Sequence, residues 1–223
     1  MNKLAFAAGL STVLVTLGAA AQQPPPPAAE PAPAPAGGAR THDGFYFRIG
    51  PNFGALIGTA KLEAGGQTGG ESDYSGFTYG GDLMFGGTPA PGLVIGGTLL
   101  WGSTKDPTVK AGSTEGTADG TLIMAATALF ANYYLDPTEG LFFQGLLGFA
   151  VVDFVTAGGQ SGSNDPTGFL LGAGAGYDFW IGDEWSVGPL ARVIYAPTSS
   201  ESGGATFKFN YLFPSIGVGF TLH

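Results

Sequence analysis

The sequence predicts an all-β protein, namely a closed, antiparallel, eight-stranded transmembrane β-barrel that follows a signal peptide and a disordered Pro/Ala-rich segment. Charged residues make up only 11% of the chain, whereas soluble domains carry about 25%. After the N-terminal segment, no apolar run is long enough for a spanning helix, which needs about 20 residues. Hydrophobic and polar residues instead alternate with a period of two. A closed barrel is the other structure that satisfies every backbone polar group in lipid.

The N-terminal part of the chain has the features of an export signal and a linker. Residues 1–21 combine a basic residue, an apolar stretch and small residues that end at Ala21, where we expect cleavage. Residues 22–42 are rich in proline and alanine, which favours extended conformations and leaves no apolar face to bury. We therefore predict a signal peptide, then a disordered periplasmic spacer, then a barrel domain at 43–223.

The alternation divides the barrel domain into eight candidate strands of the length that tilted membrane-crossing strands need. Their approximate ranges are 44–57, 75–87, 92–103, 120–135, 140–154, 168–181, 184–196 and 205–222. Short turns are predicted at 88–92, 136–140 and 182–184, and long loops at 58–74, 104–119, 155–167 and 197–204. This alternation is typical of barrels whose loops lie outside the cell and whose turns and chain ends lie in the periplasm.

The parity of each strand predicts which side chains face lipid. In most strands the odd-numbered residues are apolar and outward, and the even-numbered residues face the lumen. In the last strand we expect alternate residues to face lipid, followed by a bulge at Pro214 that changes the phase. The outward residues are Phe207, Phe209, Tyr211 and Phe213 before the bulge and Ile216, Val218, Phe220 and Leu222 after it. The fourth strand fits least well, because Leu122 and Phe130 point inward. A soluble sandwich also alternates, but its solvated faces carry more charge than these strands do.

Five charged residues fall on the predicted lumen face. They are Arg48, Asp82, Asp178, Arg192 and Lys208. Unpaired charges in a narrow interior cost several kcal/mol each, so pairing or hydration is expected. The residues form either a structural network of ion pairs that fixes the strand register or a gate in a narrow pore. A broad diffusion porin is disfavoured, because eight strands enclose only side chains or one small ligand.

Aromatic residues gather near the strand ends on the predicted periplasmic side. Tyr46, Tyr134, Phe142 and Trp180 all point inward there and predict an aromatic plug. Many other inward positions are glycine, so we expect a wetter vestibule that opens toward the outside. The glycines at 172–178 recur within a strand and not at a strand-to-helix turn, so they indicate lumen packing and no phosphate site.

Residue types limit the chemistry of the chain. It has no cysteine, which excludes disulfides and thiolate metal sites, and its net charge of −9 argues against a nucleic-acid partner. Both histidines, His42 and His223, fall at the periplasmic rim, where we expect solvated side chains. Barrel lipases and acyltransferases place histidine near the outer leaflet, so we predict no enzyme, no catalytic residue and no cofactor. Two histidines with Asp43 at flexible ends make a poor metal site.

The signal peptide, eight alternating strands, four long loops and the final IGVGFTLH resemble the small outer-membrane barrels of the outer-membrane-protein-A and opacity-protein types. The resemblance covers residues 43–223 and is one of architecture. It implies insertion by the barrel-assembly machinery, which reads a terminal aromatic residue. Here Phe220 is followed by three further residues.

These observations predict a structural or surface-interaction role. The barrel anchors the chain in the outer membrane and presents four extracellular loops rich in glycine, serine and acidic residues. The alternative is a narrow pore or transporter for small solutes or ions. We expect a monomer whose partners are outer-membrane lipid and lipopolysaccharide.

Overall fold

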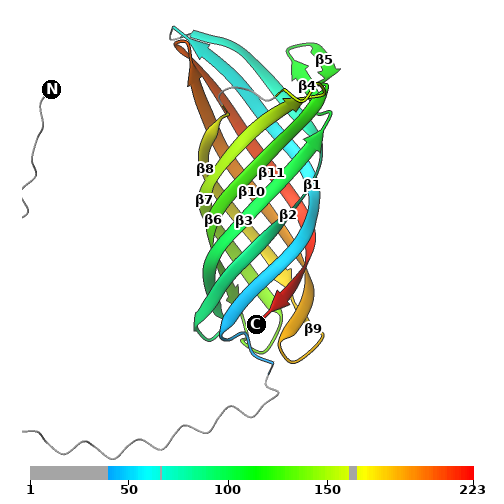
Figure 1. Ribbon diagram of the computed structural model, residues 1–223, viewed down its shortest axis with the longest axis vertical. Helices are drawn as coiled ribbons and strands as arrows, with labels where there is room; N and C mark the ends of the chain where they lie inside the picture. The colour runs from blue at the N-terminus through cyan, green and yellow to red at the C-terminus, as the bar shows by residue number, and fades with distance from the viewer. Residues whose placement is uncertain (1–39, 66, 161–164) are drawn as a thin grey trace, which may run out of the picture. The chain divides into compact units, whose positions relative to one another are not determined.

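The computed structural model describes residues 40–65, 67–160 and 165–223, which form one antiparallel β-sheet (Figure 1). The predicted signal peptide and all but the last residues of the predicted spacer lie outside this part of the chain. None of the described residues belongs to a helix long and apolar enough to cross a membrane. The strands are β1 (Phe45–Ala64), β2 (Gln67–Ala90), β3 (Leu93–Lys105), β4 (Thr108–Ala111), β5 (Thr114–Thr117), β6 (Gly120–Tyr134), β7 (Leu141–Thr156), β8 (Thr167–Tyr177), β9 (Phe179–Trp180), β10 (Trp185–Ser202) and β11 (Ala205–Leu222).

The long strands pair in a ring. β1 pairs with β2 on one side and with β11 on the other, and the remaining neighbours follow in chain order. The ring contains eight strands, β1, β2, β3, β6, β7, β8, β10 and β11. β4 and β5 form a small hairpin on β2, and the short strand β9 pairs with β10. The prediction of an all-β fold is therefore confirmed, and so is the prediction of eight antiparallel strands arranged in a ring.

The ring has two different ends. At the turn end, β1 begins, β11 ends, and short connections join β2 to β3, β6 to β7 and β9 to β10 (Figure 1). Gly92 takes a positive φ of 74° in the first of these turns, a conformation that glycine adopts without steric cost. The opposite end, the loop end, carries the β4–β5 hairpin and the other connections. The short turns were thus predicted at the correct places.

Two of the four predicted long loops are wrong. Residues 58–64 continue β1 and residues 67–74 belong to β2, while residues 197–202 continue β10 to a tight turn before β11. The β1–β11 register is kept as far as Ala64 opposite Ala205. These segments were predicted as loops because they are rich in glycine, serine and threonine. Their backbone groups are nevertheless satisfied by neighbouring strands, and charged residues pair across the ladder.

Alternation places apolar residues on the outside of the ring, as predicted. Phe77 and Leu129 are each 66% exposed, whereas the inward residues Tyr46 and Met124 are at most 1% exposed. In β6, the predicted fourth strand, the inward apolar residues, Phe130 among them, belong to the buried core. The outer surface is therefore apolar and the ring interior is densely packed.

The predicted phase change in β11 is wrong. β11 pairs with β10 in an unbroken register from Trp185 opposite Leu222 to Ser202 opposite Ala205, so Pro214 causes no bulge. The inward aromatic residues of β11 are Phe209, Tyr211 and Phe213, each at most 2% exposed. Even-numbered residues of β11 face outward along its whole length.

Lys208 therefore lies on the outer face and not in the lumen. Its ammonium nitrogen pairs with Glu63 of β1 at 2.7 Å, and 48% of the Lys208 side chain is exposed. The sequence prediction failed here because it assumed the bulge at Pro214. The lumen network consequently contains four of the five predicted charged residues.

The outward orientation of the even-numbered residues of β11 can be tested by cysteine labelling, because the chain has no native cysteine. We expect Lys208→Cys in the folded protein to react rapidly with a membrane-impermeant maleimide, since that side chain is exposed at the loop end. The neighbouring substitution Phe209→Cys is expected to react only after denaturation, because Phe209 is 2% exposed. Equal labelling of the two variants in the folded protein would contradict the assigned phase of β11.

Glycines on the inner face make room for large side chains. A Cβ atom at Gly219 would lie 2.4 Å from Nε of Arg48, and one at Gly176 would lie 2.4 Å from the ring of Phe142. Contacts this short are not tolerated, so these positions admit only glycine if their neighbours stay in place. At these two positions the space left by glycine is filled by bulky neighbours and leaves no room for water.

Candidate functional site

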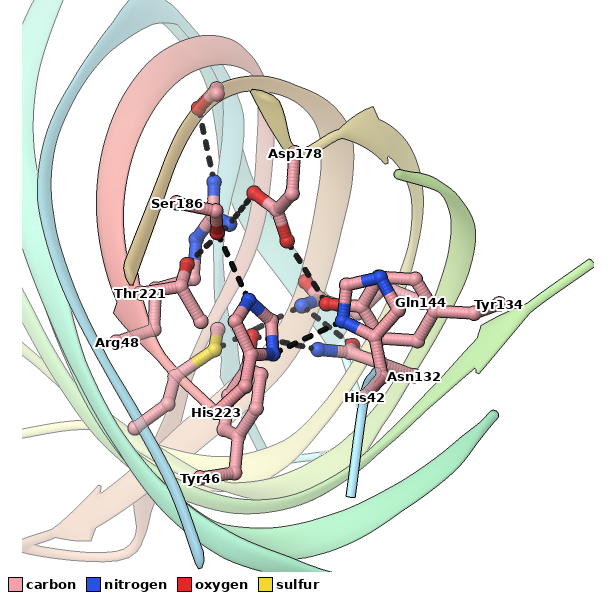
Figure 2. Close-up of polar contacts among 12 residues, drawn as sticks. His42, Tyr46, Arg48, Asn132, Tyr134, Gln144, Asp178, Ser186, Thr221 and His223 are labelled. Carbon is pink, nitrogen blue, oxygen red and sulfur yellow. Dashed lines mark hydrogen bonds and ion pairs between the residues drawn. The ribbon is translucent and has the colours of Figure 1, made fainter. Parts of the chain in front are cut away.

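A buried ion pair joins opposite parts of the ring near its turn end (Figure 2). Arg48 of β1 donates to Oδ1 of Asp178, which lies between β8 and β9, at 2.8 Å. The same guanidinium donates to Oγ1 of Thr221 at 3.0 Å and to the backbone oxygen of Gly188 at 3.0 Å. Tyr134 of β6 donates its hydroxyl to Oδ2 of Asp178 at 2.8 Å. Charge-assisted bonds of this kind are the stronger ones in proteins, and here they join β1, β6, β10 and β11 to the segment between β8 and β9.

A second ion pair lies beside the first. Arg192 of β10 donates through Nη2 to Oδ2 of Asp82 in β2 at 2.7 Å, and both side chains are buried. With its amide oxygen turned toward Arg192, Asn52 accepts from Nη2 at 2.9 Å. A cavity of about 10 Å³ separates this pair from Arg48. That volume is about what one water molecule needs.

Amide and hydroxyl groups connect the β1 side of the lumen with β6 and β7. Asn132 donates to the hydroxyl oxygen of Tyr46 at 3.0 Å, and Gln144 donates to the amide oxygen of Asn132 at 3.0 Å. Asn132 and Gln144 lie opposite each other in the β6–β7 register, so the strand pairing itself brings the two amides together. The network fixes the positions of strands that are distant in sequence.

The two histidines contact each other at the turn end (Figure 2). We call the group formed by His42, His223, Ser186 and the Glu139 carbonyl the histidine latch. Nε2 of His42 lies 2.8 Å from the Glu139 carbonyl oxygen, which only accepts, so Nε2 carries the proton. Nδ1 of His42 is then the acceptor for Nδ1–H of His223, at 2.9 Å. Nε2 of His223 accepts from the Ser186 hydroxyl at 2.8 Å. With both imidazoles neutral, every bond in this set has one donor and one acceptor.

Burial keeps the latch neutral. It lowers the pKa of His223 to about 3, and the charges of His42 and Arg48 act in the same direction. Burial also lowers the pKa of His42, although the Glu139 carbonyl and the carboxylates of Asp178 and Asp43 oppose this effect. The prediction of two solvated rim histidines placed them at the correct end but missed their burial and their contact.

The aromatic residues predicted to plug the periplasmic side surround the latch. Tyr46, Tyr134 and Phe142 are buried, and Trp180 is half-buried. The ring of His42 stacks on Tyr134 with centroids 3.5 Å apart and on Trp180 at 4.9 Å. The plug therefore includes both histidines. Their proximity follows from the pairing of the first strand with the last, which brings the flanks of β1 and β11 together.

The latch resembles a catalytic triad in its order, with Ser186 in the place of the nucleophile, His223 in that of the base and His42 in that of the orienting residue. Ser186, however, has no exposed surface, so its hydroxyl is out of reach of a substrate in this structure. Within residues 40–65, 67–160 and 165–223, no group of three or more histidine, aspartate or glutamate side chains is placed to hold a metal ion. The latch connects the segments before β1 and after β11 to each other, to β10 and to the turn between β6 and β7.

An apolar outer surface, a ring of antiparallel strands and a polar, packed lumen define a transmembrane β-barrel of the outer-membrane class. A family model of the autotransporter β-domain matches residues 53–209, more than half of the chain. The chain belongs to the autotransporter β-domain family.

One solved structure with a TM-score above 0.5 supports the same fold, and two others are similar to the chain at lower scores. The outer-membrane protein OprG from Pseudomonas aeruginosa is 16% identical, with a TM-score of 0.51 over 82% of this chain and 99% of that one. Neisserial surface protein A is 13% identical, with a TM-score of 0.47 over 80% of this chain and 96% of that one. The attachment invasion locus protein Ail of Yersinia pestis is 16% identical, with a TM-score of 0.37 over 81% and 99%. Among curated proteins, none matches.

Proposed function

We propose that this protein is a non-conducting, closed outer-membrane barrel that anchors a surface presented at its loop end. The barrel-assembly machinery inserts it after removal of residues 1–21, and it acts as a monomer. The loop end faces outward, and the turn end and both chain ends lie in the periplasm. Outer-membrane lipid and lipopolysaccharide contact its apolar outer face.

The packing of the lumen carries this proposal. Arg48, Asp82, Asp178 and Arg192 have at most 5% of their surface exposed, and all four are held in ion pairs. The cavity between the two pairs, about 10 Å³, is too small for a hydrated ion. Aromatic rings and the histidine latch fill the turn end. These contacts favour the structural network over the gate.

The loop end supplies the surface for interaction. The hairpins extend β1, β2, β10 and β11 beyond the other strands and carry charged residues on their outer face. Lys61 pairs with Glu71 at 3.1 Å, and Lys208 pairs with Glu63 at 2.7 Å. Such exposed pairs contribute little to stability, about 0–1 kcal/mol. Their value lies in presenting fixed charges to a partner.

Conductance tests the proposal directly. We expect the full mature chain, refolded into a planar lipid bilayer, to give no discrete conductance steps, because the buried ion pairs and the aromatic turn end block the lumen. Folding is checked beforehand by the mobility shift between unboiled and boiled samples.

The matched positive control removes the plug. The double substitution Tyr134→Ala and Phe142→Ala deletes two buried rings at the turn end and is expected to produce small, frequent current steps. Regular steps from the unaltered protein would contradict the plugged anchor and would support a narrow pore lined by Arg48 and Arg192.

A further inference from the structure

The lumen contains a second cavity near the loop end, with a volume of about 80 Å³. The side chains on its walls come from four strands of the ring. They are Tyr74 of β2, Leu122 of β6, Val152 and Phe154 of β7, and Phe207 and Phe209 of β11. We call this cavity the mouth pocket. Nothing in the proposed anchor role requires it.

The floor of the mouth pocket is closed and its rim is open. Leu122, Val152 and Phe209 are at most 4% exposed, so they separate the pocket from the rest of the lumen. Tyr74 and Phe207 are half-buried and border the outside. A ligand therefore has one way in, from the loop end, and no passage through the barrel.

The aromatic walls are held in place by glycines. A Cβ atom at Gly58 would lie 2.7 Å from Cζ of Phe209, and one at Gly120 would lie 2.7 Å from Cζ of Phe154. The rings of Tyr74 and Phe209 contact edge to face, with centroids 5.6 Å apart and an interplanar angle of 76°. The pocket is thus formed before any ligand arrives.

The lining selects the charge of the ligand. No lysine, arginine or histidine borders the pocket, and Asp153 and Pro166 complete its rim. Asp153 lines the pocket and Asp165 directly precedes Pro166 of the rim, so acidic groups lie beside the opening. An anionic ligand would meet these carboxylates without a cation to compensate, so the pocket disfavours anions.

The lining also selects the shape of the ligand. Four aromatic rings offer edges and faces for offset or edge-to-face contacts, each of which stabilises a ring–ring pair by about 0.5–1.5 kcal/mol beyond area burial. Apolar cavities of about 150 Å³ bind benzene. The mouth pocket is smaller but opens outward, so a single ring enters it and any substituent projects to the outside.

We propose that the mouth pocket is a binding site for one small, neutral, single-ring aromatic molecule taken up from the medium outside the loop end. The occupant packs against Phe209 at the floor and between Tyr74, Phe154 and Phe207 at the walls. Because the floor is closed, the site binds its ligand reversibly and does not pass it onward.

The test uses the full mature chain, refolded in lipid nanodiscs with labelled leucine and valine methyl groups, and fluorobenzene as the probe. We expect the methyl signals of Leu122 and Val152 to shift along a saturating curve. Signals of the outward residues Leu147 and Val193, which are 57% and 46% exposed, are expected to shift linearly, because fluorobenzene partitions into the surrounding lipid.

A matched pair of variants locates the site. Val152→Phe fills the pocket and is expected to abolish the saturating response of Leu122. Val151→Phe adds the same bulk to the neighbouring outward residue, which is 40% exposed, and is expected to leave the response unchanged. Phe154→Leu removes one ring without filling the cavity and is expected to weaken binding about threefold to tenfold.

Two outcomes would overturn the proposal. One is the absence of any saturating shift at Leu122 in the unaltered protein. The other is saturation by a short-chain aliphatic alcohol but not by fluorobenzene, which would assign the pocket to acyl chains. The mobility shift on gels confirms that each variant is folded before its response is compared.

Discussion

Replacing Asp178 with alanine is expected to lower the free energy of unfolding by about 3–5 kcal/mol, the range found when one partner of a buried ion pair is removed. The substitution leaves the Arg48 guanidinium buried without its counter-charge and leaves the Tyr134 hydroxyl without its acceptor. The remaining acceptors of Arg48, Thr221 and the Gly188 carbonyl, are neutral. Urea unfolding in lipid vesicles, followed by tryptophan fluorescence, measures the loss.

A nearby aspartate provides the matched control for this experiment. Asp183 is exposed in the turn between β9 and β10, so Asp183→Ala is expected to change stability by no more than about 0.5 kcal/mol. Replacing both members of the pair, as Arg48→Met with Asp178→Leu, removes the uncompensated charge and is expected to recover much of the loss. If Asp178→Ala and Asp183→Ala unfold at the same urea concentration, the lumen network does not stabilise the barrel.

Acid is expected to weaken the turn end through the histidine latch. In the unfolded chain His223 titrates near its ordinary pKa of 6.5, whereas in the folded protein burial lowers the pKa to about 3. Between these values the unfolded state binds a proton that the folded state does not, so stability falls as pH decreases from about 6.5 to 3. Above that window both states are neutral and the latch is intact. The expected loss is roughly 2–4 kcal/mol.

Carboxylates also titrate at acidic pH, so the contribution of the latch is read as a difference between variants. His223→Gln has no imidazole to protonate, and its stability is expected to fall less steeply than that of the unaltered protein between about pH 6.5 and 4. His42→Gln is expected to give a smaller difference in the same direction, because neighbouring carboxylates partly offset the effect of burial on His42. Parallel stability curves for all three proteins would show that the imidazoles titrate alike in the folded and unfolded states, and would contradict a latch that is held neutral by burial.

The strands of the ring were predictable because each exposes one face to lipid. Residues such as Phe77 and Leu129 mark that face with a period of two, and short turns rich in glycine and proline separate the strands. The hairpins at the loop end were not predictable from this pattern. There the outer face carries ion pairs such as Lys61 with Glu71 and Lys208 with Glu63, so the apolar alternation that marks a membrane strand is lost although pairing continues.

The candidate site was predictable in its residues but not in its contacts. Inward parity identified Arg48, Asp82, Asp178 and Arg192, yet which cation meets which carboxylate depends on the tilt and stagger of strands around the ring. Lys208 was misplaced because a proline within a strand was interpreted as a bulge. The histidine contact depends on ring formation, which brings the flanks of β1 and β11 together.

The pairing of β1 with β11 also determines when the ring can form during folding. Phe47 lies opposite Leu222, so the first strand finds one of its two partners only when the last strand of the ring is present. Every shorter chain leaves two unpaired edges, whose backbone groups have no partner in hydrocarbon. A chain that ends before β11 is therefore expected not to form the ring in a membrane, because β1 and β10 would both lack a partner.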